Sequence, residues 1–138
     1  MISFNHETDF KLLEEAKISK WISSIILKEN CKEDEINYIF CDDEYLHKLN
    51  VEFLQHDTLT DVISFDYSVG KILQGDIYIS IERVADNARD FKVDFETELH
   101  RVIIHGVLHY CGYKDKTEAD AALMRSKEDE ALALLKAM

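Results

Sequence analysis

The sequence predicts an α+β (mixed α/β) fold, in which a small four-stranded mixed sheet is packed with four to five helices. Two observations support this prediction. Short segments in which apolar and polar residues alternate, as in half-buried strands, are interspersed with longer segments whose apolar residues recur at helical spacing. The 138 residues also fit a single domain, 1–138, because no repeat, linker or low-complexity tract divides the chain.

The first part of the chain is expected to contain two strands and two helices. Residues 2–6 and 36–41 have the alternation that is typical of strands. A helix is predicted from about residue 9 to 29. Its apolar residues are Leu13, Ala16, Ile18, Trp21, Ile22, Ile25 and Ile26. Asp42 or Asp43 can cap the second helix. That helix carries Tyr45, Leu46, Leu49 and Phe53.

Two more strands are predicted in the middle of the chain. A loop, 55–60, leads into a strand at 61–67, which is rich in β-branched and aromatic residues. A turn through Gly70 connects it to a strand at 75–81. A short helix over 82–91 follows.

The last third of the chain is expected to be helical. A mainly apolar helix is predicted over 95–111. Thr117 and Asp120 resemble a capping box at the start of a final helix. The residues of that helix expected to pack inward are Leu123, Met124, Leu132, Leu134 and Leu135.

Composition limits the class of function. The net charge of −12 disfavours a strong non-specific grip on nucleic acid and favours basic protein partners. No apolar run approaches the roughly 20 residues that span a membrane, so we expect no membrane partner. Three cysteines without a C-x-x-C pair agree with a reducing compartment, and we expect a cytoplasmic protein. No glycine-rich phosphate loop is present, so we expect no nucleotide cofactor.

The run HGVLHYCGYKD, at 105–115, has the spacing of a metal site. His105 and His109 are four residues apart and project from one face of a helix. Gly112 can take the left-handed conformation that ends a helix and turns the chain back, which brings Asp115 within reach. The sequence therefore predicts one divalent ion held by His105, His109 and Asp115, on a central helix and the following turn, with an open coordination position. Ordinary helix histidines and a simple helix stop are the less favoured interpretation.

The site resembles the metzincin pattern H-E-x-x-H-x-x-G-x-x-H with two differences. Gly106 stands at the position of the catalytic Glu, and Asp115 stands at that of the third His. Cys111 points to another side of the helix and is expected to pack as a small hydrophobe.

The residues around the histidines are expected to be locally cationic. Arg101, Lys114 and Lys116 are the candidates for positioning a phosphate. The sequence assigns no general base. Gly106 has no side chain that can serve, and His100 lies on another helix face.

Two carboxylates remain as guesses for the general base. Asp61 and Asp76 stand at strand positions, where capping or turn formation explains them at least as well. A bound divalent ion can lower the pKa of its water towards about 7 and polarise a phosphoryl oxygen. The anionic Asp115 is expected to weaken this acidification.

Taken together, the motifs resemble the YbeY family of metal-dependent endoribonucleases that mature ribosomal RNA. The similarity runs through LNVEFLQHDTLTDVISFDY (49–67), QGDIYIS (74–80) and the histidine run, and it extends to a terminal helix with Met124 and Glu128. The usual metal motif of the family is H-G-x-L-H-L-x-G-Y-D-H. Asp115 takes the place of its third histidine and Lys114 that of its aspartate. Leu54 stands where the family usually has a functional arginine.

The resemblance implies a single-strand-specific endoribonuclease in which His105 and His109 are catalytic. It implies a role in rRNA processing, including maturation of the 3′ end of 16S rRNA, and in ribosome biogenesis. The implied partners are single-stranded or ribosomal RNA and ribosomal or assembly proteins. The implied metal is Zn²⁺, although a carboxylate ligand is harder than imidazole and makes Mn²⁺ or Ni²⁺ conceivable.

Two other functions stay open at this point. One is a metallopeptidase with metzincin-like spacing, which Gly106 weakens because it removes the carboxylate that activates water. The other is a non-catalytic, metal-stabilised ribosome-assembly factor.

Overall fold

A four-stranded mixed sheet forms the frame of the fold in the computed structural model, which describes residues 1–54 and 60–138. The strands are β1 (Ile2–His6), β2 (Lys32–Cys41), β3 (Val62–Asp66) and β4 (Ile72–Ser80), in the order β1-β2-β4-β3. The pairs β1/β2 and β2/β4 are parallel, whereas β3 runs antiparallel to β4. The predicted four-stranded mixed sheet is confirmed for the described residues.

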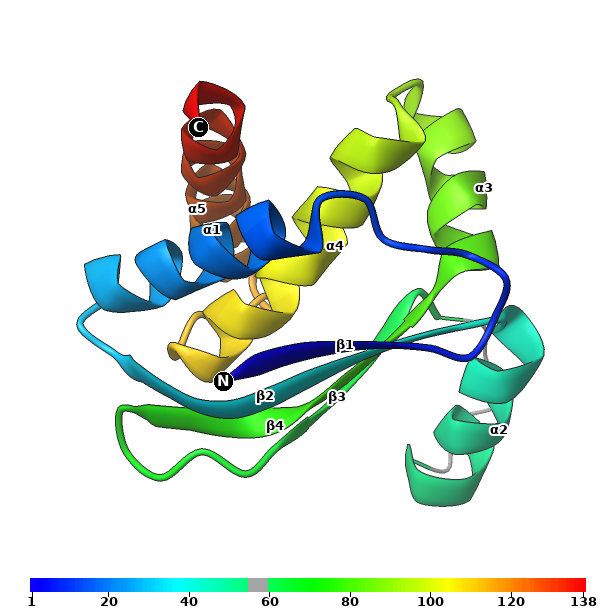
Figure 1. The fold of residues 1–138 in the computed structure, drawn as a ribbon, viewed down its shortest axis with the longest axis horizontal. Coiled ribbons are helices and arrows are strands. Elements are labelled where there is room, and N and C mark those ends of the chain that lie inside the picture. The colour runs from blue at the N-terminus through cyan, green and yellow to red at the C-terminus, as the bar shows by residue number, and fades with distance from the viewer. Residues whose placement is uncertain (55–59) are drawn as a thin grey trace.

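Five helices complete the described fold. They are α1 (Glu15–Lys28), α2 (Asp43–Leu54), α3 (Ile81–Phe91), α4 (Phe95–Tyr110) and α5 (Glu118–Ala137). In Figure 1, α1, α4 and α5 lie together on one side of the sheet, and α2 lies apart from them. The predicted α+β class is therefore confirmed.

Alternating residues of the strands divide the interior into a large and a small core. Ile77 and Ile79 of β4 are fully buried in the large core, together with Ile103 and Val107 of α4. Between them in sequence, Tyr78 turns to the opposite face of the sheet. There it packs against a small cluster, formed by Cys41, Leu46 and Ile63, beneath α2. Helix α4, which carries both histidines, thus lies at the centre of the molecule.

Two glycines permit close packing around α4. A Cβ on Gly106 would lie 3.0 Å from Cδ1 of Ile77, so the helix can approach β4 closely. A Cβ on Gly75 would overlap the carbonyl oxygen of Phe65 and the hydroxyl of Tyr110. That hydroxyl donates to the same carbonyl at 2.9 Å, which ties the end of α4 to β3.

The first helix starts later than predicted. It begins at Glu15 rather than near residue 9, after Glu14 takes a left-handed conformation with φ of 57°. The segment before Glu14 is not helical. It is tied to the end of β1, because the backbone N–H of Leu12 donates to Nε2 of His6 at 3.1 Å. Leu12 is buried there, whereas Leu13, which was assigned to the helix, is 62% exposed.

Two strands start earlier than predicted, because they pair with each other beyond their alternating segments. Lys32 of β2 lies opposite Ile72 of β4, so both strands extend towards their N-termini. Strand β4 ends at Ser80 because the Ser80 side chain caps α3, accepting from the N–H of Arg83 at 3.1 Å. The predicted loop 55–60 lies outside the described residues except for Thr60.

The prediction for the last helix is confirmed in part. Thr117 caps α5, because its hydroxyl accepts from the N–H of Asp120 at 3.0 Å. Met124 and Leu135 are buried as expected and Leu132 is partly buried. The prediction that Leu123 and Leu134 pack inward is wrong, because these residues are 49% and 37% exposed. The buried face of α5 follows a single helical stripe made of Met124, Glu128, Ala131 and Leu135.

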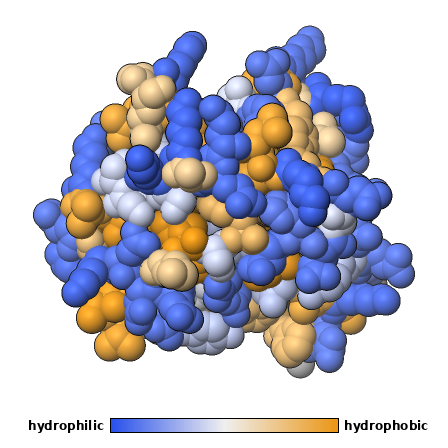
Figure 2. Space-filling model, in the orientation of Figure 1, coloured by the Kyte–Doolittle hydropathy of each residue, from blue (hydrophilic) through white to orange (hydrophobic). Residues whose placement is uncertain are grey.

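The surface is predominantly hydrophilic on the face shown in Figure 2, where hydrophobic residues form separate small patches. Within the described ranges, none of the helices combines the length and apolar character that a membrane crossing requires.

Candidate metal centre

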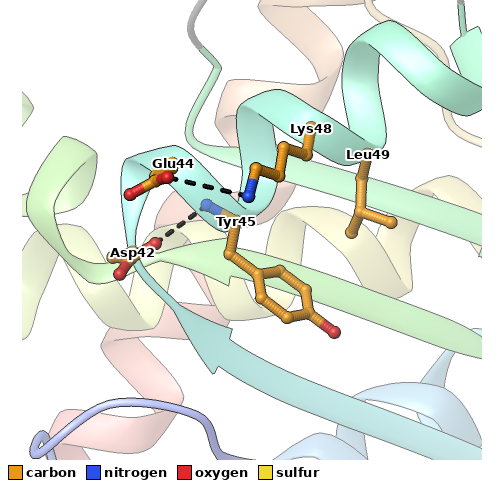
Figure 3. Close-up of a pocket in the computed structure, with 5 residues that line it drawn as sticks. All are labelled: Asp42, Glu44, Tyr45, Lys48 and Leu49. Atoms are coloured by element: carbon orange, nitrogen blue, oxygen red, sulfur yellow. Dashed lines mark hydrogen bonds and ion pairs between the residues drawn. The ribbon is translucent and has the colours of Figure 1, made fainter.

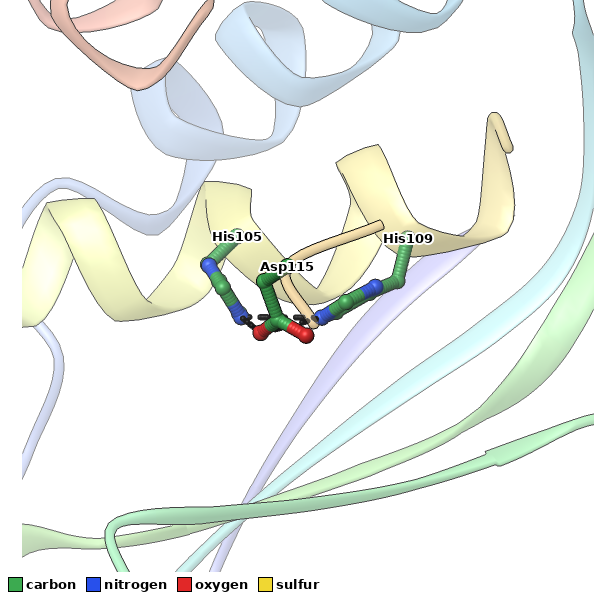
Figure 4. Close-up of side chains that lie close together, drawn as sticks. All are labelled: His105, His109 and Asp115. Carbon is green, nitrogen blue, oxygen red and sulfur yellow. Dashed lines mark hydrogen bonds and ion pairs between the residues drawn. The ribbon is translucent and has the colours of Figure 1, made fainter. Parts of the chain in front are cut away.

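Three side chains converge at the C-terminal end of α4. Nε2 of His105 lies 2.9 Å from Nε2 of His109, because residues four apart share one helix face. Oδ2 of Asp115 lies 3.2 Å from Nε2 of His109 and 3.3 Å from Nε2 of His105. Figure 4 shows the two rings and the carboxylate pointing at one another. The three ligand atoms form a nearly equilateral triangle.

A glycine turn brings the carboxylate to the histidines. Gly112 has a φ of 106°, in the left-handed region, as predicted. Its N–H donates to the carbonyl of His109 at 3.0 Å, and the N–H of Tyr113 donates to that of Leu108 at 3.1 Å. These bonds end α4 and reverse the chain, so that Asp115 returns to the helix face it has just left.

The hydrogen bonds of the two rings fix where their lone pairs point. Nδ1 of His105 lies 2.6 Å from Oε2 of Glu128, and Nδ1 of His109 lies 2.9 Å from the carbonyl oxygen of Tyr113. Both oxygens accept, so both Nδ1 atoms carry a proton and donate. In the neutral rings the two Nε2 atoms are then bare acceptors, and they face each other and the Asp115 carboxylate. A divalent cation placed between them would satisfy all three acceptors at once.

The triangle also has the right size for a small divalent ion. Ligand atoms about 2.0–2.1 Å from a tetrahedral zinc lie about 3.3 Å from one another. The observed edges, 2.9, 3.2 and 3.3 Å, agree with this spacing. Three protein ligands leave a fourth position free, which is the arrangement of catalytic rather than structural zinc sites. The residues present therefore fit a divalent metal.

Glu128 is the charged partner of His105. Burial alone lowers the pKa of His105, but the hydrogen bond to Glu128 and the charges of Glu128, Asp115 and Asp61 outweigh it and raise the pKa. Burial alone raises the pKa of Glu128, but His105 and Arg101 outweigh it and lower the pKa. The Glu128 carboxylate is thus ionised at neutral pH and holds the His105 ring as an Nδ1 donor.

Sequence reasoning gave Glu128 no role, although it lies in the terminal helix that resembles the family. The available signal was its position on the buried stripe of α5. A charged residue on such a stripe, four residues after Met124, requires a buried partner. Two partners are found, because Arg101 donates to the same carboxylate at 2.8 Å.

The three predicted phosphate contacts are not equally available. Arg101 is committed to two carboxylates, donating to Glu128 at 2.8 Å and to Asp129 at 2.7 Å. Lys114 and Lys116 are exposed on the turn before α5, and neither has an ion pair within the described part of the chain. Of the three predicted phosphate contacts, the structure leaves these two lysines accessible.

The two candidate carboxylates for a general base lie on different surfaces of the protein. Asp61 lines a cavity next to His105. Asp76 lies on a different surface, where its carboxylate accepts from the side chain of Asn37 at 3.0 Å. The ring of His100 packs edge-on against Trp21, with ring centroids 6.0 Å apart. The structure thus brings one of the two proposed carboxylates to the candidate site.

Cys111 follows α4 but belongs to the interior. It is partly buried against the large core, as predicted. Burial and the neighbouring Cys31 raise the pKa of its thiol well above the usual value. A protonated thiol is a poor metal ligand, so Cys111 stays outside the ligand set.

No second metal group is found in residues 1–54 and 60–138. His105, His109 and Asp115 form the one group of at least three His, Cys, Asp or Glu residues there whose ligand atoms lie within 4.8 Å of one another. A cavity of about 370 Å³ lies at the start of α2, as shown in Figure 3, and its described side chains do not form a metal-ligand group. Its Glu44 pairs with Lys48 at 3.6 Å, and the carboxylate of Asp42 accepts from the N–H of Tyr45 at 2.8 Å.

Comparison with known proteins identifies the family of the chain. The family described as endoribonuclease YbeY matches residues 2–136 of this chain. The chain belongs to the YbeY family. Proteins named endoribonuclease YbeY from Flavobacterium johnsoniae and Flavobacterium psychrophilum are 65% and 69% identical to it over 134 residues, which are 97% of this chain and 96% of each relative. The YbeY protein of Christiangramia forsetii is 56% identical over 133 residues, with 96% and 93% covered.

A solved structure supports the YbeY fold. The solution structure of a Thermotoga maritima protein is similar to this chain with a TM-score of 0.74 and 29% identity, covering 98% of this chain and 89% of that protein. The predicted resemblance to the YbeY family and the predicted fold are both confirmed.

Proposed function

We propose that this protein is a single-strand-specific, metal-dependent endoribonuclease that acts in rRNA processing. The observation that carries the proposal is the triangle of bare acceptor atoms on His105, His109 and Asp115, in a chain of the YbeY family. Three ligands and one free position are what metal-assisted hydrolysis requires.

The proposed ligands of the metal are His105, His109 and Asp115. Zn²⁺ is the preferred ion, because two imidazoles and one carboxylate suit it, with Mn²⁺ or Ni²⁺ as alternatives that the harder carboxylate favours. When bound, such an ion supplies an acidified water and polarises a phosphoryl oxygen.

The other side chains have supporting roles in this proposal. Glu128 holds the His105 ring in the tautomer that presents Nε2 to the metal, and the carbonyl of Tyr113 does the same for His109. Lys114 and Lys116 are accessible for contacts with RNA phosphates next to the site. Arg101 acts on Glu128 rather than on the RNA, because its guanidinium group is already bound to two carboxylates.

The proposed substrate is ribosomal RNA in single-stranded form, including the 3′ end of 16S rRNA. The proposed place of action is the cytoplasm, where ribosomes mature. A net charge of −12 makes non-specific RNA binding weak. We therefore infer that ribosomal or assembly proteins, which are basic, help to bring the enzyme to its substrate.

A peptidase function is not favoured by the structure around Gly106. This position, where metzincins have their catalytic glutamate, is buried and faces Ile77 of β4. A carboxylate there would point into the sheet rather than at the metal.

Cleavage of end-labelled single-stranded RNA tests the proposal. We expect the zinc-loaded protein to cut the RNA, and we expect cleavage to stop with chelator and to return when one metal is restored. His105→Ala should abolish cleavage, because it removes a ligand. The matched control is His47→Ala, which removes a histidine from α2, outside the metal group.

Two outcomes would reject the nuclease. If the RNA survives under every metal tested, or if His105→Ala cuts as fast as the wild type, the reaction does not occur at this site. Metal-dependent folding and a stable ribosomal partner without turnover would then identify an assembly factor.

A further inference from the structure

A second cavity opens beside the metal centre. It has a volume of about 210 Å³. Its walls come from α4, from the start of β3 and from α5, and consist of Asp61, Val62, Glu98, Arg101, Val102, His105 and Glu128. Pockets for drug-sized ligands measure roughly 300–1,000 Å³, so this cavity suits a single ring system.

Glu98 is an unusual member of this cavity. It is only 6% exposed, yet its carboxylate has no hydrogen bond or ion pair within the described residues. Burial and the nearby Asp61 raise its pKa. Its oxygens are not fully enclosed by protein, so a ligand in the cavity can donate hydrogen bonds to them.

The charge of the cavity excludes a phosphate. Its one permanent cation, Arg101, is bound to Glu128 and Asp129, while Asp61 and Glu98 are both acceptors. The described lining of the cavity also lacks a set of ligands for a second metal ion. Within the described chain, Asp61, Glu98 and Glu128 do not form a group whose ligand atoms come within 4.8 Å. The cavity therefore fits a neutral ligand that donates hydrogen bonds.

We propose that this cavity binds the nucleobase next to the scissile phosphate, and that Glu98 recognises its amino edge. Guanine matches best, because its N1–H and exocyclic amine both donate in one direction and can be accepted by one carboxylate. Uracil has no exocyclic amine and leaves the carboxylate only half satisfied. This inference rests on the proposed endoribonuclease function.

The geometry of α4 supports the assignment. Glu98 and His105 are seven residues apart on one face of the helix, about 10 Å along its axis. That span is comparable with the reach from a phosphate at the metal to the far edge of an attached base. Val62 and Val102 supply apolar walls for the ring faces.

Binding of the four nucleoside 5′-monophosphates to the zinc-loaded protein tests the proposal without requiring cleavage. All four carry the same phosphate, so differences between them report on the base. We expect GMP to bind about tenfold more tightly than UMP. GMP should also shift the methyl resonances of Val62 and Val102 in NMR spectra.

The decisive comparison uses two variants of the same helix. Glu98→Gln should reduce the affinity for GMP about tenfold and leave that for UMP unchanged. Glu96→Gln removes the same charge two residues away, from a side chain that does not line this cavity, and should change neither affinity.

Several results would overturn the assignment. They are equal binding of the four nucleotides, a GMP preference that survives in Glu98→Gln, or valine shifts caused by zinc beyond one equivalent. Valine shifts of that kind would show that the cavity binds a cation. If the protein prefers GMP but does not cut RNA, the nuclease proposal is rejected and the base pocket stands. If the protein cuts RNA but shows no preference among the bases, the base pocket is rejected and the nuclease proposal stands.

Discussion

Glu128 of α5 accepts a hydrogen bond from Nδ1 of His105 of α4 at 2.6 Å. The bond joins a candidate metal ligand to the last described helix, 23 residues away in sequence. It fixes the tautomer of the ring, because a carboxylate oxygen can only accept.

Glu128→Gln is expected to weaken zinc binding by about 10–100-fold, because an amide holds the His105 ring less strongly and can also turn a donor towards it. The measurement is competition for zinc with a chromophoric chelator. Glu130→Gln is the matched control, since Glu130 lies on the same helix, is largely exposed and pairs only with Lys127 among the described residues. Equal affinities in the two variants would remove Glu128 from the metal site.

Glu98→Gln is expected to stabilise the metal-free protein at neutral pH by a few tenths of a kcal/mol, up to about 1 kcal/mol, because it removes a largely buried carboxylate whose oxygens still reach the cavity. The pKa of Glu98 is raised in the folded state, so the folded protein holds this proton to higher pH than the unfolded chain does. The wild type therefore loses stability as pH rises through the unfolded pKa towards the folded one.

Urea unfolding at pH 4 and pH 7 measures this effect. The gain from Glu98→Gln should be absent at the lower pH and present at the higher. A variant that is less stable than wild type at pH 7 would mean that Glu98 has a stabilising partner.

Gly75→Ala should destabilise the protein by about 3 kcal/mol or more, since its Cβ would overlap the Phe65 backbone, which cannot move without breaking the β3/β4 pairing. Gly106→Ala should cost less, about 1–2 kcal/mol. Its Cβ meets the end of the Ile77 side chain at 3.0 Å, and a side-chain methyl group is displaced at less cost than a backbone carbonyl in a strand pair. Thermal unfolding of both variants tests the order, and the reverse order would contradict it.

Asp115→His should move the pH midpoint of RNA cleavage to a lower value. Three neutral imidazoles leave one more unit of positive charge on the ligand sphere than two imidazoles and a carboxylate, and bound water is then more acidic. A pH–rate profile of wild type and variant with zinc provides the measurement. A midpoint that stays in place would show that the ionising group is not controlled by residue 115.

The sequence was most informative where one local rule decides the structure. The histidine helix and its glycine turn were predictable, because the spacing of His105 and His109 and the conformational freedom of Gly112 act within a few residues. The strands β2 and β4 were predicted too short, since their outer residues are fixed by pairing with each other and not by their own alternation.

The surroundings of the candidate site were not predictable in the same way. Arg101 looked like a phosphate contact in the sequence, because its partners Glu128 and Asp129 lie 27 and 28 residues away. The buried Glu98 gave no signal at all, since an acidic residue in the first turns of a helix is ordinarily a solvated one. Both depend on how α5 and β3 pack on α4.

The order of the helices also has a consequence for biosynthesis. A nascent chain contains both histidines of α4 before it contains Glu128, which orients one of them. The ring of His105 has no buried carboxylate to hold it until translation has passed α5 and that helix has docked. We therefore expect full affinity for the proposed metal only after α5 has been synthesised, and a ribosome-bound intermediate that ends before α5 should retain the ion only weakly.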